Sequence, residues 1–195
     1  MVRRKAVVLF VFILLVTMLG GCAQNALPSP VAPNDPTKMD EQQANALDNP
    51  QNPGSFAGQT MSVTVYSATK DAMYLVAEKH VVPKNAHPAQ TAIELLLAGT
   101  KNTDLVSVMP VGTKLRHISV KDNIAYVDFN DKLVKNNTGG SAGEILLVAA
   151  IVNTMTEFPD VHKVQILVDG KKIDTISGHM DTSEPLSRSE KIIKK

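Results

Sequence analysis

The chain has a single cysteine, Cys22, among its 195 residues. One thiol cannot form an intramolecular disulfide, so the folded part of the chain must be stabilised by its core alone. A zinc ribbon is excluded as well, because such sites need several cysteines at fixed spacing.

Aromatic residues are also scarce, with no Trp, three Tyr and five Phe. After Gln59 the aromatics are Tyr66, Tyr74, Tyr126, Phe129 and Phe158. This composition argues against a platform on which sugars or bases would stack.

The chain also lacks an excess of basic residues. Removing Arg3, Arg4 and Lys5 from the 20 basic residues leaves 17 against 19 acidic ones. Nucleic-acid binding needs a basic surface, so nucleic acid is not predicted as a partner.

The first 21 residues have the pattern of a bacterial secretory signal peptide. Three basic residues precede an apolar run from Ala6 to Leu19, and small residues then lead to Cys22. The end of this segment resembles the lipobox of bacterial lipoproteins, which implies cleavage before Cys22 and attachment of diacylglycerol, with palmitate among the acyl chains, to its sulfur. The alternative is an uncleaved transmembrane anchor, but the run is shorter than the roughly 20 residues that span a bilayer. We therefore expect an extracytoplasmic protein anchored to the cell membrane by lipid.

Composition divides the rest of the chain into three parts. Residues 22–58 contain six prolines among Asn, Gln, Asp and Ala, which predicts a disordered tether. Residues 59–187 are long enough for one domain with a sizeable core. Residues 188–195 form a basic tail, for which solvation or contact with anionic lipid is expected.

Hydrophobic patterning predicts three β-hairpins in the domain. The first joins residues 61–67 to 74–82, and alternation of apolar and polar residues indicates both strands. The second joins 115–120 to 124–129 through Asp122 and Asn123, and the third joins 164–168 to 172–176 through Asp169-Gly170.

Two helices separate these hairpins. The first begins at Pro88 and ends before Gly99. The second begins with a predicted capping box, Ser141 to Glu144, and ends before Pro159. The order ββ-α-ββ-α-ββ predicts an α+β fold, a two-layer sandwich with two amphipathic helices on one face of a largely antiparallel sheet.

Residues 139–143 match G-x-S-x-G, the nucleophile elbow of serine hydrolases, with Asp169, Asp174 and His179 downstream. The elbow requires a buried strand running directly into the turn, whereas a polar loop precedes Gly139. A helix-capping role for Ser141 is the favoured interpretation, and no catalytic residue is predicted.

The remaining polar residues give weak signals. The histidines His80, His87, His117, His162 and His179 form no zinc-binding pair of the HxxxH type, so no metal or cofactor is predicted. His179 and Asp181 could form half of a metal site, and the glycines before the second helix could bind an anion. Ordinary surface, turn or capping roles are the simpler explanation for both.

Several stretches of the domain resemble one protein family, the sporulation and spore germination domain (GerMN). The similar stretches are Glu94–Gly99, Pro110–Thr113, Val120–Phe129, Gly139–Ser141, Ile151–Pro159, Val164–Gly170 and Gly178–Leu186. The resemblance implies a lipoprotein of spore-forming bacteria whose architecture is similar to ring-building domains of secretion machines. It supplies no catalytic residues, and this chain resembles a single-domain form where studied members carry two domains.

We therefore expect a non-enzymatic domain that binds proteins of the cell envelope or spore, or itself, during sporulation, germination or envelope assembly. Two alternatives remain open. One is a module that binds a small ligand or cell-wall fragment, which a deep apolar pocket would favour. The other is a serine hydrolase that uses Ser141.

Overall fold

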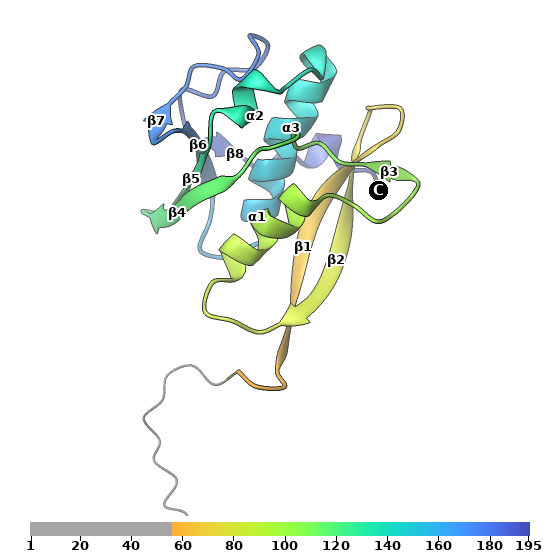
Figure 1. The fold of residues 1–195 in the computed structure, drawn as a ribbon, viewed down its shortest axis with the longest axis vertical. Coiled ribbons are helices and arrows are strands. Elements are labelled where there is room, and N and C mark those ends of the chain that lie inside the picture. The colour runs from red at the N-terminus through yellow and green to blue at the C-terminus, as the bar shows by residue number, and fades with distance from the viewer. Residues whose placement is uncertain (1–55) are drawn as a thin grey trace, which may run out of the picture. The chain divides into compact units, whose positions relative to one another are not determined.

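The structure is a computed structural model and describes residues 56–195 (Figure 1). The elements are β1 (Thr60–Thr69), β2 (Leu75–Pro83), α1 (Pro88–Ala98), β3 (Leu105–Val106), β4 (Leu115–Lys121), β5 (Ile124–Phe129), α2 (Lys132–Lys135), α3 (Gly140–Met155), β6 (Lys163–Val168), β7 (Lys171–Lys172), β8 (Leu186–Ser187) and a 3-10 turn at Glu190–Ile192. The predicted α+β class is confirmed. Residues 1–55, with Cys22, lie outside the described residues.

The strands lie in two sheets rather than in the single sheet that the sequence predicted. The first sheet has the order β2-β1-β3, and β1 pairs with β2 along almost its whole length. β3 pairs with β1 only at Ala68 and Thr69. The hairpin of β1 and β2 was predicted, whereas β3 lies in a stretch predicted to be a loop.

The second sheet has the order β4-β5-β6-β7, and β8 also pairs with β6. Two tight turns within it agree with the sequence, because Asp122, Asn123, Asp169 and Gly170 all have positive φ, between 50° and 77°. Such angles at both central residues fit type I′ turns, which suit the twist of hairpin strands. The pair β5–β6 is parallel, since the connection between these strands runs through α2 and α3.

The helices α1 and α3 lie between the two sheets in Figure 1, and each contacts strands of both. Eleven of the 16 residues of α3 are therefore buried, including residues on every side of the helix. This differs from the expected amphipathic helix, because a helix covered on all sides does not need a polar face. The main core around it includes Leu75, Phe129, Leu147 and Ile151.

The C-terminal segment, residues 186–194, runs along the domain and is held by backbone contacts. The Ser189 N–H donates to Asn153 Oδ1 at 2.9 Å, and Asn153 Nδ2 donates back to the Ser189 carbonyl at 3.0 Å. The Lys194 N–H donates to the Leu75 carbonyl at 2.8 Å. The side chains of Lys191, Lys194 and Lys195 are exposed, as expected for basic residues.

Candidate functional site

The predicted capping box at the start of α3 does not form. The helix begins at Gly140, its N-cap residue is Gly139, and no side chain bonds to the first turn. Ser141 lies inside the first turn, past the position from which a side chain could cap. This prediction was wrong because the second member of the box, Glu144, turns into the protein and bonds to another segment.

The hydrolase alternative has no geometric support either. The element before Gly139 is the short helix α2, and the nearest preceding strand ends at Phe129. Within residues 56–195, no hydrogen bond joins Ser141 to His179. The G-x-S-x-G match is therefore the coincidental sequence of a loop that enters a helix.

Glu144 is instead the acceptor around which residues 175–179 fold. Its side chain is fully buried. Oε1 accepts from the Thr175 hydroxyl at 2.7 Å, the Ile176 N–H at 3.1 Å and the Ser177 N–H at 2.9 Å. Oε2 accepts from the His179 N–H at 3.0 Å and lies 2.9 Å from His179 Nδ1. This segment has no regular secondary structure, so the carboxylate satisfies backbone groups that a helix or sheet would otherwise satisfy.

These contacts explain the acidity of the carboxyl group. Burial alone would raise the pKa of Glu144, but hydrogen bonds from Ser177, Thr175 and His179 outweigh it and lower the pKa to about 2. The group is therefore ionised at neutral pH. A permanently charged, fully enclosed carboxylate with all its contacts inside the protein acts as a structural support and not as a general acid or base.

His179 and Asp181, considered above as half of a metal site, contact different side chains and do not form a shared site. His179 contacts Glu144, whereas Asp181 accepts hydrogen bonds from the backbone and hydroxyl of Ser183. Across residues 56–195, no three His, Cys, Asp or Glu side chains gather closely enough to hold a metal ion.

Three acidic side chains near turns and strand ends, those of Asp128, Asp131 and Asp169, also have partners within the protein. Asp128 accepts from the Gly170 N–H at 2.8 Å, and Asp131 pairs with Lys135 at 2.6 Å. Asp169 pairs with Arg116 at 2.6 Å, close to the exposed Lys171 and Lys172 of β7. The Asp174 carbonyl accepts from the Thr182 N–H at 2.8 Å, so residues 174–182 fold back on themselves.

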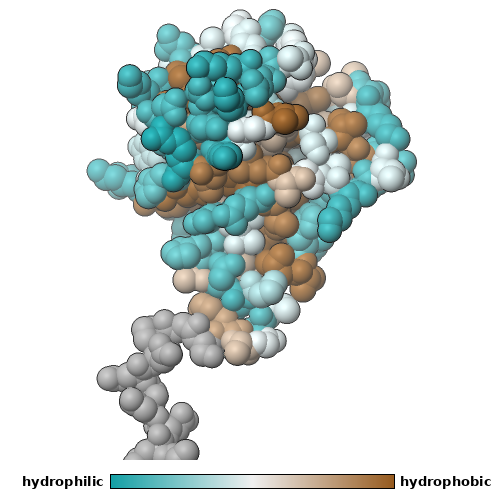
Figure 2. Space-filling view, viewed as in Figure 1, coloured by the Kyte–Doolittle hydropathy of each residue, from teal (hydrophilic) through white to brown (hydrophobic). Residues whose placement is uncertain are grey.

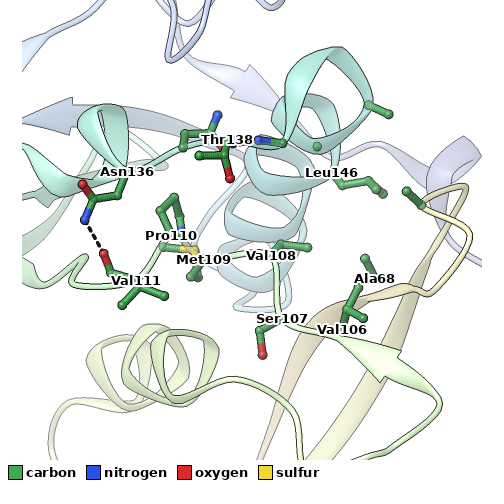
Figure 3. Close-up of a pocket in the computed structure, with 15 residues that line it drawn as sticks. Ala68, Val106, Ser107, Val108, Met109, Pro110, Val111, Asn136, Thr138 and Leu146 are labelled. Carbon is green, nitrogen blue, oxygen red and sulfur yellow. Dashed lines mark hydrogen bonds between the residues drawn. The ribbon is translucent and has the colours of Figure 1, made fainter.

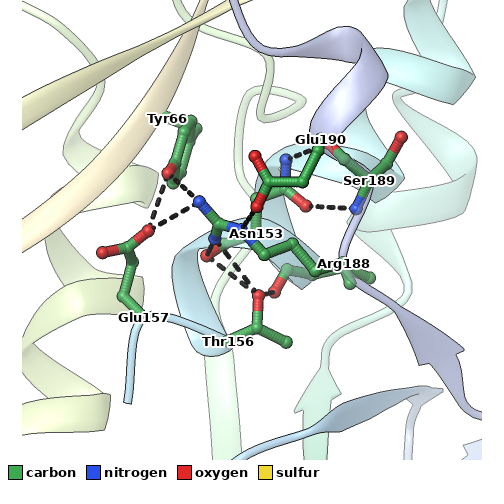
Figure 4. A network of polar contacts seen from close by, with 8 residues as sticks. Tyr66, Asn153, Thr156, Glu157, Arg188, Ser189 and Glu190 are labelled. Atoms are coloured by element: carbon green, nitrogen blue, oxygen red, sulfur yellow. Dashed lines mark hydrogen bonds and ion pairs between the residues drawn. The ribbon is translucent and has the colours of Figure 1, made fainter. Parts of the chain in front are cut away.

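A second polar cluster, shown in Figure 4, fastens the C-terminal segment to both β1 and the end of α3. The guanidinium of Arg188 donates to the Tyr66 hydroxyl at 2.6 Å and to the Asn153 carbonyl at 3.0 Å. It also lies 2.9 Å from the carboxylate of Glu157, which in turn accepts from the Tyr66 hydroxyl at 2.7 Å. Burial and the hydrogen bond to Glu157 raise the pKa of Tyr66, so the phenol stays protonated and donates.

Neither cluster was predicted from the sequence, although the sequence contains a weak indication of each. Arg188 is one of only two arginines after residue 4, and arginine is the residue that can bind several acceptors at once. The position of Glu144 three residues after Ser141 predicted a capping box at the start of the helix, and not a contact with residues 175–179. Apart from the pairing of Arg188 with Glu190, the contacts of both residues join positions more than 30 residues apart, which a local sequence pattern does not reveal.

A cavity of about 410 Å³ opens between the loop that follows β3 and the first turns of α3 (Figure 3). Its lining comes from residues 106–111, residues 136–139 and one side of the α3 N-terminal turns, with Ala68 and Ala72 from the first hairpin. None of the lining residues is charged. Figure 2 shows brown and white residues, rather than teal ones, between the hairpin turn and the start of α3.

Comparison with known proteins finds a matching family and several similar proteins. Residues 64–174 match the family Germane, which is described as sporulation and spore germination. The spore germination protein GerM of Bacillus subtilis (strain 168) is 27% identical over 142 residues, which are 70% of this chain and 38% of that protein. The chain thus spans less than half of the length of this curated relative.

Solved structures of the same relative agree in fold. The tandem GerMN domains of the Bacillus subtilis sporulation protein GerM superpose with a TM-score of 0.58 at 24% identity, over 66% of this chain and 46% of that one. The first GerMN domain alone gives a TM-score of 0.57 at 24% identity, over 66% of this chain and 98% of that one. The described residues of this chain therefore contain the equivalent of one such domain.

Proposed function

Because the chain belongs to the Germane family of sporulation and spore germination domains, we propose that it is a lipid-anchored, extracytoplasmic protein that acts in sporulation or germination by binding another protein. The family match over residues 64–174 is the observation that carries the biological setting. A protein of the cell envelope or the spore, or a second copy of the chain, is the expected partner.

The anchor is proposed from the residues around Cys22. Basic residues 3–5, the apolar run and the small residues before the cysteine together support lipidation of its sulfur. None of the helices between residues 56 and 195 is long and apolar enough to cross a bilayer.

Metabolic labelling with a fatty-acid probe tests the anchor. The unaltered chain should be labelled and should fractionate with membranes, whereas Cys22→Ser should be unlabelled and released. Ala23→Ser is the matched control, because it changes the neighbouring residue and leaves the thiol in place. An unlabelled Cys22→Ser protein that still fractionates completely with membranes would contradict the proposed anchor.

Binding rather than catalysis is proposed because the polar clusters are used within the fold while several apolar side chains are exposed. The polar atoms of Glu144 and Arg188 form hydrogen bonds within the protein. Val111 and Val106, which line the same cavity, are 87% and 41% exposed. Exposed apolar side chains that lie together, unlike isolated ones, support a protein-binding surface.

Site-specific photo-crosslinking in sporulating cells tests the binding function. The full chain would carry a photoreactive residue at exposed positions on different faces, such as Val106 and Lys121, and adducts would be identified at successive stages. We expect an adduct with a defined protein from at least one face. Absence of any protein adduct from every face would contradict the binding function.

A ligand-binding function is the second candidate, and the cavity beside α3 is the observation that favours it. Its volume lies within the range of about 300–1,000 Å³ that is typical of small-molecule sites. Native mass spectrometry of the full chain purified from its own cells distinguishes the two functions. A stoichiometric small molecule that survives purification would favour the ligand function.

A further inference from the structure

The turn that joins β1 to β2 carries two exposed apolar side chains. Met73 is 59% exposed and Tyr74 is 41% exposed. Hydrogen bonds fix the backbone that presents them. The Tyr74 N–H donates to the Thr69 hydroxyl at 3.1 Å, and the Met73 N–H donates to Asp71 Oδ1, also at 3.1 Å. The two side chains are therefore held in solvent by a defined turn.

The C-terminal segment lies directly beside this turn. Ile193 forms a parallel bridge with Leu75, the residue after Tyr74, and the Lys194 N–H donates to the Leu75 carbonyl at 2.8 Å. Tyr74 consequently lines the same hollow of the surface as residues 190, 191 and 193–195. The fold thus brings together two exposed segments that are far apart in the sequence.

Lysines predominate where these two segments meet. We call this surface the tip patch and define it as residues 70–74 together with residues 190–195. Its lysines, all of them exposed, are Lys70, Lys191, Lys194 and Lys195. Lysine has a long, flexible stem, so its ammonium group can turn toward an anionic surface beside the turn. Positive charge therefore flanks the exposed apolar side chains.

The two acidic residues of the tip patch do not cancel this charge. Glu190 pairs with Arg188, which lies outside the patch. Asp71 accepts a hydrogen bond from the Thr69 hydroxyl, and this bond and the nearby charge of Lys194 lower the pKa of Asp71. Asp71 is thus ionised and offsets one lysine, and the patch keeps a net positive charge.

This combination of side chains fits an anionic membrane surface better than a folded protein. Tyrosine is favoured at the boundary between head groups and acyl chains, and lysine is attracted to anionic head groups. A stable protein interface buries about 800 Å² on each partner, and lysine is depleted from such interfaces. Met73 and Tyr74 supply only a small part of that area, whereas a fluid bilayer can adapt to an exposed turn.

We propose that the tip patch binds the surface of a membrane that contains anionic phospholipids, with Met73 and Tyr74 among the head groups and the lysines beside lipid phosphates. This contact goes beyond the protein-binding function and the anchor at Cys22 proposed above, and it depends on neither. It would orient the domain on the membrane, because the turn lies at the end of β1 away from Thr60 (Figure 1).

A double charge reversal, Lys191→Glu with Lys194→Glu, tests the electrostatic part of the contact. Both side chains are exposed, so the fold should be unaffected. Each lysine near an anionic membrane gives about a fivefold gain in binding, so the pair should lower the contact by roughly tenfold or more. The matched control is Lys171→Glu with Lys172→Glu on β7, which changes the net charge equally on exposed residues outside the tip patch.

Tyr74→Ser tests the apolar part of the contact. It should lower the contact by roughly threefold or more, because the apolar surface buried in the membrane interface becomes smaller. Val81→Ser is the matched control, because Val81 is 74% exposed on β2 and lies outside the tip patch. Thermal unfolding confirms that each variant is folded, and the double lysine variant decides the result if Tyr74→Ser is not.

The experiment reconstitutes the full chain in phosphatidylcholine vesicles with or without phosphatidylglycerol. The chain carries an apolar photoreactive residue at Met73 or, separately, at Val81. Residues 1–55 are the same in every sample, so differences in lipid adducts report the domain. We expect lipid adducts from the Met73 probe when phosphatidylglycerol is present, and roughly tenfold fewer without it. The Lys191 and Lys194 reversal and Tyr74→Ser should reduce these adducts as stated, and both controls should leave them unchanged.

The other outcomes contradict the proposal in distinguishable ways. Equal adducts from Met73 in both kinds of vesicle would exclude recognition of anionic lipid. Equal losses in the two double lysine variants would show an effect of net charge and not of a site. A Val81 probe as reactive as the Met73 probe would show that the domain has no fixed orientation.

The Met73 probe in sporulating cells separates a membrane from an acidic protein as the occupant of the tip patch. We expect lipid adducts there as well. Protein adducts in place of lipid adducts would assign the patch to a protein and refute the membrane contact. The protein-binding function stands or falls separately, since it is tested by probes at Val106 and Lys121.

Discussion

The buried carboxylate of Glu144 gives the sharpest test of how the fold is held together. Replacing it by alanine removes the acceptor of three backbone N–H groups, those of Ile176, Ser177 and His179, and of the Thr175 hydroxyl. Removing one side of a buried charged cluster costs about 3–5 kcal/mol, because its partners stay buried without bonds. Glu144→Ala should therefore lower the free energy of unfolding by about that amount.

Glu144→Gln removes the negative charge but keeps the size and shape of the side chain, so it isolates the effect of the charge on stability. The amide oxygen can accept from residues 175–177, but the amide NH₂ then faces the His179 N–H, which is a second donor. Leaving one such group unsatisfied costs about 1–3 kcal/mol, so the glutamine variant should lie between wild type and alanine.

The contribution of Glu144 to the free energy of unfolding should fall as the pH is lowered. The pKa of Glu144 is lowered from 4.5 to about 2 in the folded protein, so its contribution is complete above pH 4.5 and is lost as the pH falls from 4.5 to 2. A difference of this size corresponds to about 3 kcal/mol. Glu144→Gln lacks the titrating group, so subtracting its pH profile removes the contributions of the other carboxyl groups.

Urea denaturation of each variant at pH 7, and of wild type and Glu144→Gln between pH 5 and pH 2, measures these effects. An alanine variant within about 0.5 kcal/mol of wild type would refute the assigned role, since changes of that size are typical of ordinary surface sites. Parallel pH profiles for wild type and Glu144→Gln would refute the low pKa of Glu144.

Substitutions at three further positions follow from the contacts. Arg188→Ala should cost about 2–3 kcal/mol in urea denaturation, and Arg188→Lys should recover only part, because an ammonium group cannot reproduce the several directed bonds of the guanidinium. Ser141→Ala should change the free energy of unfolding by less than about 0.5 kcal/mol, and a loss near 1 kcal/mol would restore the capping role. Gly99→Ala should cost about 1–2 kcal/mol or more by thermal unfolding, since Gly99 has φ of 77° and an added Cβ would clash with the Ser107 hydroxyl.

The features that the sequence predicted well are local. Pro88 occupies the start of α1, Gly99 follows its end with positive φ, and the turns at Asp122-Asn123 and Asp169-Gly170 form as expected. In each case the covalent structure of one or two residues decides which backbone angles are accessible, because proline fixes φ whereas glycine, Asp and Asn tolerate a positive φ. The neighbouring residues therefore suffice for the prediction.

The features that the sequence did not predict depend on distant residues. The sequence predicted a helix between β5 and β6 but placed all strands in one largely antiparallel sheet, whereas these two strands pair in parallel and the strands divide into two sheets. Glu144 fits a capping box in the local pattern, but the fold brings residues 175–179 within reach and they bond to it instead. The cavity likewise combines segments from β1, the loop after β3 and α3.

The central claim, a role in sporulation or germination without catalysis, is tested most directly by spore formation in the bacterium that encodes the chain. The measurement is the yield of heat-resistant spores that germinate, compared among wild type, a deletion strain and deletion strains complemented with the unaltered chain or with Ser141→Ala. We predict that deletion lowers the yield and that both complementing chains restore it. Normal spores in the deletion strain, or a Ser141→Ala strain as deficient as the deletion, would contradict the account.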